Sequence, residues 1–420
     1  MTSDERPTAP GRRAVVGLVA TGVAVHLFFL LSLRTGWLNF LFNDSSHTRQ
    51  AFDFAVFYLA GRALEAGQDI YGLQAAFGFR YLPAFAMSVG RIFALFPPRT
   101  AYLLYLAITE LILLANLWLT WRWIPPSGPP DRRRRATATF FWLAFSPYYL
   151  ELYMGQVSFW TASLLFIFLC ALERPRAAGL AWTGAALIKP NALILVPFLL
   201  RLRRFRSLGF CLLALLLLSL PYFLLHPGSL RSFIDLNLGT RHFTGALAHA
   251  GNLGLWAGLV SLTAKLAGLP LAELSGLEEL PLWGRSAVFL SVAAVIGTAL
   301  VFTFNRRPVS PLFLAALWLT SYFLIYKDVW EHHFVFLLPV LVVLYLETGS
   351  RKLLIIFSLI AIPTPFFLFD AQSGVHGNID PERLWNIGTS LLYRSFKLTP
   401  LIALWLWLLK RVHHTPSPTG

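Results

Sequence analysis

The sequence predicts an all-α polytopic membrane protein, and three observations support that prediction. Of its 420 residues, 56% are hydrophobic and only 13% are charged, and the mean hydropathy of +0.62 is well above that of soluble domains. Several runs of about 17 or more residues are nearly free of charge, long enough to cross a hydrocarbon core about 30 Å thick. The net charge of +15 comes from short basic clusters between apolar runs, a pattern typical of orientation signals rather than of a nucleic-acid partner.

The first elements follow from taking the basic clusters as cytoplasmic. The run 14–33 follows two arginines and no small-residue cleavage site comes after it, so we expect an uncleaved first span with a cytoplasmic N-terminus. Residues 34–99 then form a first outer loop with interfacial helices. Within it, 82–96 is apolar but short, and a crossing there would put the basic cluster 132–135 outside. We therefore expect 82–96 to lie on the outer surface.

A broken hairpin is predicted where two apolar halves, 177–188 and 191–200, are each too short to span. Basic groups flank both ends, so the chain would enter and leave on the cytoplasmic side, with Lys189 and Pro190 at a broken tip. The other full spans are expected at 101–121, 136–150, 157–172, 208–225, 284–304, 312–326, 334–346 and 353–369, and at the C-terminal end. The total is about ten full spans plus the broken hairpin.

The predicted organisation is therefore a single transmembrane domain over 1–410, with a second outer loop at 227–283 and a loose tail at 411–420. Charge parity places most polar residues at the outer side: Asp53, Glu151, Gln156, His242, Asn252, Asp328, Glu331, His332 and His333. The inner loops contain little beyond Arg, Lys, Pro and Gly, and no phosphate loop of the Walker type. Any chemistry is expected to face outside, away from ATP and nucleotide sugars.

Asp53 stands at the start of an amphipathic helical pattern. The apolar stripe of that helix consists of Phe52, Val56, Leu59 and Ala63. The carboxylate would lie beside this stripe on an apolar surface, where its protonation state would respond to burial and partners. It could serve as a base, or it could be an ordinary acidic residue favoured by the helix macrodipole.

The neighbours of Asp53 along this stretch, Arg62, Glu65 and Asp69, are expected to be helix-surface residues. Elsewhere, Lys189 is costly inside a bilayer; it could supply a positive charge to a lipid phosphate, or pair with Glu110. Both cysteines, Cys170 and Cys211, lie inside apolar runs, so neither a disulfide framework nor a metal cluster is indicated.

Two turns hold further polar candidates. In 153–160, Gly155 permits close approach and Gln156 can bind hydroxyls or phosphate oxygens without charge, although a simple turn would explain the pattern as well. The turn 327–334 holds two acids, a lysine, a tryptophan and two adjacent histidines, which would point to different faces of a helix. Its spacing fits no strong metal motif, and a polar interface anchor is the alternative.

Five blocks in order along the chain resemble those of glycosyltransferase family 87. They are DFAVFYLAGRALEAGQDIYG from Asp53, FRYLPAFA, GQVSFWTASLLF, IKPNALILVPFLL and WEHHFVFLLP. The resemblance implies the type C glycosyltransferase fold. It also implies transfer of a sugar, mannose in many members, from a polyprenyl phosphate at the outer face of the cell membrane. Leu82 stands where the family commonly has proline, and GNLGLWAG from Gly251 matches the family pattern only loosely.

The resemblance implies that Asp53 is the catalytic acid/base and that His332 lies near the active site. We expect one inverting displacement in which Asp53 takes the proton of the acceptor hydroxyl, while cationic or hydrogen-bonding groups, among them His332, stabilise the departing lipid phosphate. Candidates for binding that phosphate or the substrates are Lys189, Gln156, Arg241, His242, Asn252, His333 and Tyr81.

No metal and no other cofactor is expected. The expected partners are the polyprenyl-phosphate sugar, a lipid or glycan acceptor and membrane lipids, and no nucleic acid. Two alternatives remain. A transporter or flippase of lipid-linked sugars would also have a broken hairpin, although it should show repeated halves. An oligosaccharide ligase or polymerase would also face outside.

Overall fold

The structure is a computed structural model that describes residues 12–42, 50–73, 78–238, 248–271, 274, 276–364 and 380–413. It is 78% helical, and these residues contain no strand. A single antiparallel bridge, between Asn252 and Trp330, is the one β-type pairing in the described chain. The prediction of an all-α fold is confirmed.

Five helical segments are long and apolar enough to cross a membrane, by length and composition. They are α1 (Arg12–Thr35), α6 (Pro98–Arg122), α12 (Phe205–Leu225), α15 (Leu282–Phe304), and the segment Glu331–Thr348, which comprises the 3₁₀ turn η7 (Glu331–Phe336) and α17 (Leu337–Thr348). In the first four, 17–28% of the residues are buried, whereas 94% of the residues in the last are buried. The protein is therefore membrane-spanning, with α17 in the middle of the helix bundle.

The other predicted spans are shorter or interrupted. The stretch 136–150 is divided between α7 (Arg132–Leu143) and α8 (Ser146–Met154), because Phe145 is extended and Pro147 starts a new helix without an N–H to continue the old one. The remaining short helices are α9 (Ser158–Cys170), α16 (Pro311–Ile325) and α18 (Arg351–Ala361), whereas α20 (Ile387–Arg411) is one continuous helix of 25 residues with Pro400 inside it. The count of about ten spans stays a prediction, and the end of the expected span 353–369 lies outside the described residues.

The break predicted inside the apolar stretch 177–200 is present. Helix α10 (Pro175–Ile188) ends before Lys189, whose backbone is extended because proline follows it, and a 3₁₀ turn η4 (Pro190–Leu195) leads into α11 (Val196–Arg201). The indole N–H of Trp182 donates to the carbonyl of Ala192 at 2.8 Å and joins the two halves. The side of the membrane from which this segment enters stays a prediction.

The predicted first outer loop contains α3 (Phe52–Glu65) and several short helical pieces. These are η1 (Asn39–Leu41), η2 (Ile70–Gly72), α4 (Pro83–Phe85), the π-helical turn η3 (Ala86–Gly90) and α5 (Arg91–Ala94). Helix α3 packs against η3 and α5, and two glycines permit this close contact. A Cβ atom on Gly61 would lie 2.2 Å from the carbonyl oxygen of Gly90.

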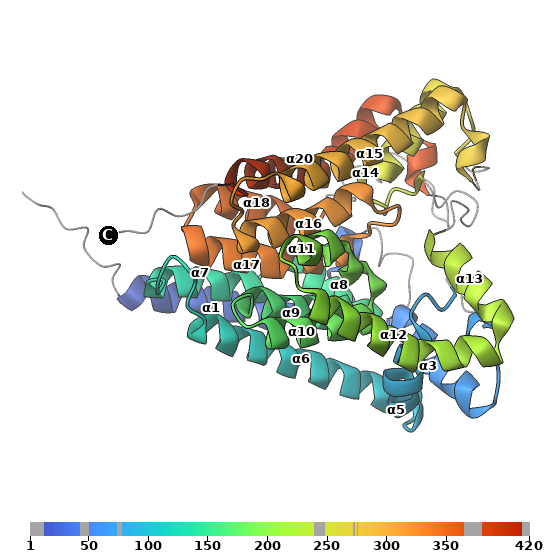
Figure 1. Ribbon diagram of the computed structural model, residues 1–420, viewed down its shortest axis with the longest axis horizontal. Helices are drawn as coiled ribbons and strands as arrows, with labels where there is room; N and C mark the ends of the chain where they lie inside the picture. Colours follow the sequence, from blue (N-terminus) through green and yellow to red (C-terminus); the bar gives the residue numbers. More distant parts are fainter. Residues whose placement is uncertain are drawn as a thin grey trace, which may run out of the picture.

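The remaining elements are α13 (Pro227–Leu238), α14 (Leu255–Leu266), η6 (Leu277–Glu279) and η8 (Pro381–Arg383). Figure 1 shows α3, α5 and α13 at one end of the bundle and the start of α1 at the other. Helices α14, α15, α16, α18 and α20 form one side of the bundle, and α6, α10 and α12 form the opposite side. Turn η7 packs on α8 and α9, so it brings its histidines toward the loop that joins those two helices.

Candidate active site

A buried lysine forms the centre of a polar cluster at the α8–α9 turn. Lys189 is only 7% exposed, and its ammonium donates to Ser158 Oγ at 2.6 Å and to Gln156 Oε1 at 3.1 Å. The Tyr81 hydroxyl donates to the same Gln156 oxygen at 2.9 Å. The structure thus brings together three predicted residues, Lys189, Gln156 and Tyr81, from three separate segments of the chain.

The aromatic rings around this lysine are part of the same cluster. Lys189 Nζ lies 5.7 Å from the ring centre of Tyr81 and 5.9 Å from that of Phe336. A cation over an aromatic face is favoured by the ring quadrupole, and more so where water is scarce. The cationic group is therefore held in place by hydrogen bonds and aromatic rings, and it also interacts electrostatically with the buried carboxylate of Glu151.

The turn that carries Gln156 is itself rigidly built. The backbone N–H groups of Gly155 and Gln156 both donate to the carbonyl of Glu151 at 3.0 Å, and the Glu151 carboxylate accepts from the N–H of Phe159 at 2.7 Å. Gly155 has a φ of +75°, which favours glycine. A Cβ there would lie 2.5 Å from Phe54 Cβ, so the close approach that this glycine permits is that of α3.

Asp53 lies in the first turn of α3 and is buried. The start of the helix is held by the N–H of Ala51, which donates to the carbonyl of Tyr153 at 2.8 Å. The Asp53 carboxylate interacts electrostatically with Lys189 and His332. Asp53, predicted to lie on an apolar helix surface, is thus a buried carboxylate whose electrostatic neighbours include Lys189 and His332.

The two histidines of η7 are both buried, with ring centres 4.3 Å apart. His333 Nδ1 accepts from the backbone N–H of Trp330 at 3.2 Å, so this ring folds back onto its own turn. His332 interacts electrostatically with Asp53 and Lys189. Of the two histidines, His332 is the one whose electrostatic neighbours include the carboxylate of α3.

Arg80 is a cation of this site that sequence reasoning missed. Its Nη1 atom lies 2.8 Å from Asp328 Oδ2, and it interacts electrostatically with Asp53 and Lys189. Ser158 was missed as well. The partners of Arg80 and Ser158 lie far away along the chain, so there was little reason in the sequence to select either residue. The only signal was that Arg80 stands beside Tyr81 in FRYLP and that Ser158 follows Gln156 in GQVSF.

The structure places Asn252 against the backbone of the turn that precedes η7. Its amide nitrogen donates to the carbonyl of Lys327 at 2.7 Å, and its Oδ1 accepts from the N–H of Val329 at 3.0 Å. Asn252 therefore holds this turn, and its contact with substrate stays a prediction. Arg241 and His242 lie outside the described residues.

The pairing of Lys189 with Glu110, one of the two alternatives, is wrong. Glu110 instead accepts from the Tyr148 hydroxyl at 2.9 Å and lies 2.9 Å from Nε2 of His26 on α1. These groups belong to α1, α6 and α8, whereas Lys189 contacts the α8–α9 turn. No three His, Cys, Asp or Glu side chains that could share a metal ion gather within the described ranges, and metal independence stays a prediction.

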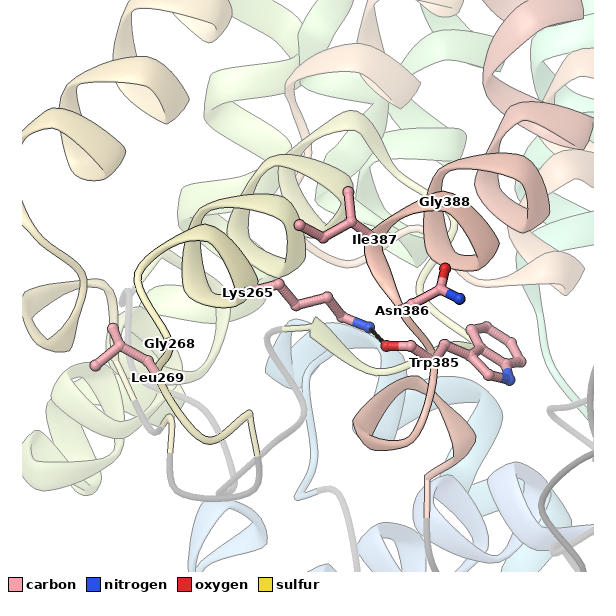
Figure 2. A pocket seen from close by; sticks show the side chains of 7 residues that line it. All are labelled: Lys265, Gly268, Leu269, Trp385, Asn386, Ile387 and Gly388. Atoms are coloured by element: carbon pink, nitrogen blue, oxygen red, sulfur yellow. Dashed lines mark hydrogen bonds between the residues drawn. The ribbon is translucent and has the colours of Figure 1, made fainter.

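A separate open cavity of about 560 Å³ lies between the end of α14 and the start of α20. Figure 2 shows the Lys265 side chain reaching across it toward the carbonyl of Trp385. Lys265 also donates to Ser390 Oγ at 2.7 Å and to the carbonyl of Glu382 at 2.8 Å. None of the predicted site residues lines this cavity, and Lys265 ties α14 to η8 and α20.

Comparison with known proteins shows the family to which this chain belongs. The model of glycosyltransferase family 87 matches residues 79–326, which is more than half of the chain. The matched part includes Arg80, Tyr81, Gln156 and Lys189, and lies between Asp53 and the two histidines. A search of curated proteins finds no match. Because the match covers more than half of the chain and includes Lys189 and its hydrogen-bond partners, the chain belongs to glycosyltransferase family 87.

Proposed function

We propose that this glycosyltransferase moves a sugar from a polyprenyl-phosphate donor to a lipid or glycan acceptor. The observation that supports this most is the buried group of Asp53, Lys189 and His332, which combines a carboxylate for proton removal with a cation and a hydrogen-bonding imidazole for a phosphate. The sequence contains no phosphate loop for a nucleotide. Mannose is our proposal for the sugar, and it rests on the resemblance to the family.

The reaction we propose is a single displacement with inversion. An Asp53 oxygen takes the proton of the acceptor hydroxyl as that oxygen attacks the anomeric carbon. The bond between this carbon and the phosphate oxygen breaks, and its electron pair stays on the phosphate. The phosphate charge therefore rises from −1 in the donor to −2 in the product, so nearby cations stabilise the transition state more than the bound donor.

Each further candidate has a place in this scheme. Lys189 provides the positive charge, and Gln156 and Tyr81 orient it. His332 interacts electrostatically with both Asp53 and Lys189. We propose that it contacts the departing phosphate. With these roles, Asp53 is essential to the chemical step, and Lys189 contributes both to donor binding and to the chemical step.

The topology we propose puts this site at the outer face of the cell membrane, with the N-terminus in the cytoplasm. The support is the distribution of charge, because the basic clusters that follow the positive-inside rule lie away from the polar candidates. Single cysteines placed in the predicted outer loops should react with a membrane-impermeant thiol reagent added to intact cells. Reaction only after the cells are lysed would contradict this topology.

The proposed transfer can be tested with purified protein, radiolabelled polyprenyl-phosphate mannose and candidate acceptors. We expect Asp53→Asn to abolish transfer while donor binding is retained, because the amide cannot accept the proton. Asp235→Asn is the matched control, since Asp235 is an exposed acid on α13 that pairs only with Arg231 of its own helix in the described structure. Full activity of Asp53→Asn would refute the assignment of the base. Movement of the intact lipid across a vesicle membrane without bond cleavage would indicate a flippase instead.

A further inference from the structure

Arg80 is the second cation beside Lys189, and its position has a consequence for the donor. It belongs to the described residues 78–82 that precede α4 and form no helix, and its guanidinium pairs with Asp328 in the turn before η7. Asp328 is almost fully buried, whereas 27% of the Arg80 side chain is exposed. The cation is therefore fixed on one side and accessible on the other.

The hydrogen-bonding capacity of Arg80 is only partly used. A guanidinium has five N–H donors in a rigid fork, a geometry that matches two oxygens of a phosphate. The bond to Asp328 uses Nη1, and the buried Nε of Arg80 has no hydrogen-bond partner within the described residues. A buried donor without a partner costs about 1–3 kcal/mol, and the guanidinium therefore has hydrogen-bonding capacity that the protein does not use.

The two cations also repel each other. Arg80 and Lys189 interact unfavourably, and both interact with Asp53. Carboxylates offset part of this cost, since Asp328 pairs with Arg80 and both Glu151 and Asp53 interact with Lys189. Because both cations act on Asp53, a phosphate that binds beside Asp53 lies within electrostatic range of both.

We propose that Arg80 and Lys189 together bind the phosphate of the lipid donor, and that Asp328 is a positioning residue that holds Arg80 in place. This inference rests on the proposed function, because it takes the ligand to be a lipid phosphate monoester or diester. As the sugar–phosphate bond breaks and the phosphate gains a negative charge, Arg80 contributes more to the transition state than to the bound donor. The alternative is that the Arg80–Asp328 pair only fastens the first outer loop to η7.

Binding of farnesyl phosphate, a short-chain analogue of the product, tests this without any need for catalysis. With the full-length protein in detergent, we expect Arg80→Gln to weaken binding of farnesyl phosphate at least tenfold and to leave binding of farnesol unchanged. Arg80→Lys should recover part of the affinity, since it keeps the charge but loses the fork. Arg62→Gln is the matched control, because Arg62 pairs with Glu65 at 2.9 Å on the exposed face of α3.

Asp328→Asn separates the two explanations. If Arg80 binds the phosphate, this variant should keep farnesyl phosphate binding within about threefold, because the amide oxygen can still accept from the guanidinium. Equal losses in Arg80→Gln and Asp328→Asn would show that the ion pair is only structural and would overturn the proposal. Inorganic phosphate should compete weakly, and competition as strong as that of farnesyl phosphate would overturn the assignment to a lipid phosphate.

Activity measurements distinguish this proposal from the proposed function. In the transfer assay, Arg80→Gln should lower kcat by more than it raises the KM for the donor. Unchanged transfer together with unchanged inhibition by farnesyl phosphate would remove Arg80 from the site and leave the transferase function intact. Arg80-dependent binding of farnesyl phosphate in a protein that transfers no sugar would retain the phosphate site and refute the transferase reaction.

Discussion

Gly155→Ala should damage both the stability and the activity of the protein, since this glycine joins the α8–α9 turn to α3. Two costs add at this position. An alanine at a φ of +75° is strained by about 1–2 kcal/mol, and its Cβ would lie 2.5 Å from Phe54 Cβ, an overpacking that typically costs about 1–3 kcal/mol. The sum is about 2–5 kcal/mol of unfolding free energy.

The same substitution should also affect catalysis, because Phe54 is the neighbour of Asp53. Relieving the clash would move the first turn of α3 away from the turn that carries Gln156. A displacement of about 1 Å can reduce a rate about 100-fold. We therefore expect a large fall in kcat in the transfer assay, measured alongside the thermal unfolding midpoint of the purified protein in detergent.

Gly67→Ala provides the control for backbone strain alone. Gly67 has a φ of +65°, but no atom lies within 4 Å of the place that its Cβ would occupy. This variant should lose only the strain of about 1–2 kcal/mol and keep its activity. Equal losses of stability and of activity in the two variants would refute the idea that close packing between Gly155 and Phe54 positions Asp53.

Two further predictions concern charges outside the proposed reaction. Lys397→Met should lower the free energy of unfolding by about 3–5 kcal/mol, because Lys397 lies 2.7 Å from the buried Glu331 and its loss leaves that carboxylate unpaired by charge. Adding Glu331→Gln should restore part of the lost free energy, and a double variant no more stable than Lys397→Met would contradict this. Burial alone would raise the pKa of Asp69, but hydrogen bonds, chiefly from Ser229 and the backbone of Tyr71, outweigh it and hold the pKa below its usual value. The stability that Asp69 contributes is therefore present above the pKa of the unfolded chain and is lost as the pH falls below about 4; the difference in unfolding midpoint between wild type and Asp69→Asn should shrink over that range, and a constant difference would show that the charge of Asp69 is irrelevant.

The membrane fold could be predicted because its signals are local. Long uncharged runs identify spans wherever they occur, and a Lys189–Pro190 pair inside an apolar stretch marks a break, since proline removes an N–H and excludes the preceding residue from the helix. The division between α7 and α8 was missed, although Pro147 was visible, because a proline inside an apolar run is also compatible with one continuous span.

The site could be predicted only in part, because its geometry depends on contacts between distant segments. Asp53, Lys189 and Gln156 each had a local reason to be selected, but Arg80 was passed over because its partner, Asp328, lies 248 residues away. Contacts with distant segments also explain why the prediction for Asp69 was wrong. It was expected on a helix surface, yet it accepts hydrogen bonds from Tyr222 at 2.8 Å and Ser229 at 2.6 Å, whereas Arg62 does lie on the exposed helix surface.

The most direct test of the central claim is to measure sugar transfer and donor binding in the same preparation of wild type and Asp53→Asn. We expect the wild type to transfer the radiolabelled sugar from the polyprenyl phosphate with inversion at the anomeric carbon. Asp53→Asn should bind the donor with similar affinity and transfer no sugar. Transfer by Asp53→Asn at the wild-type rate, or a product with the anomeric configuration of the donor, would contradict the proposal that Asp53 is the base of a single displacement.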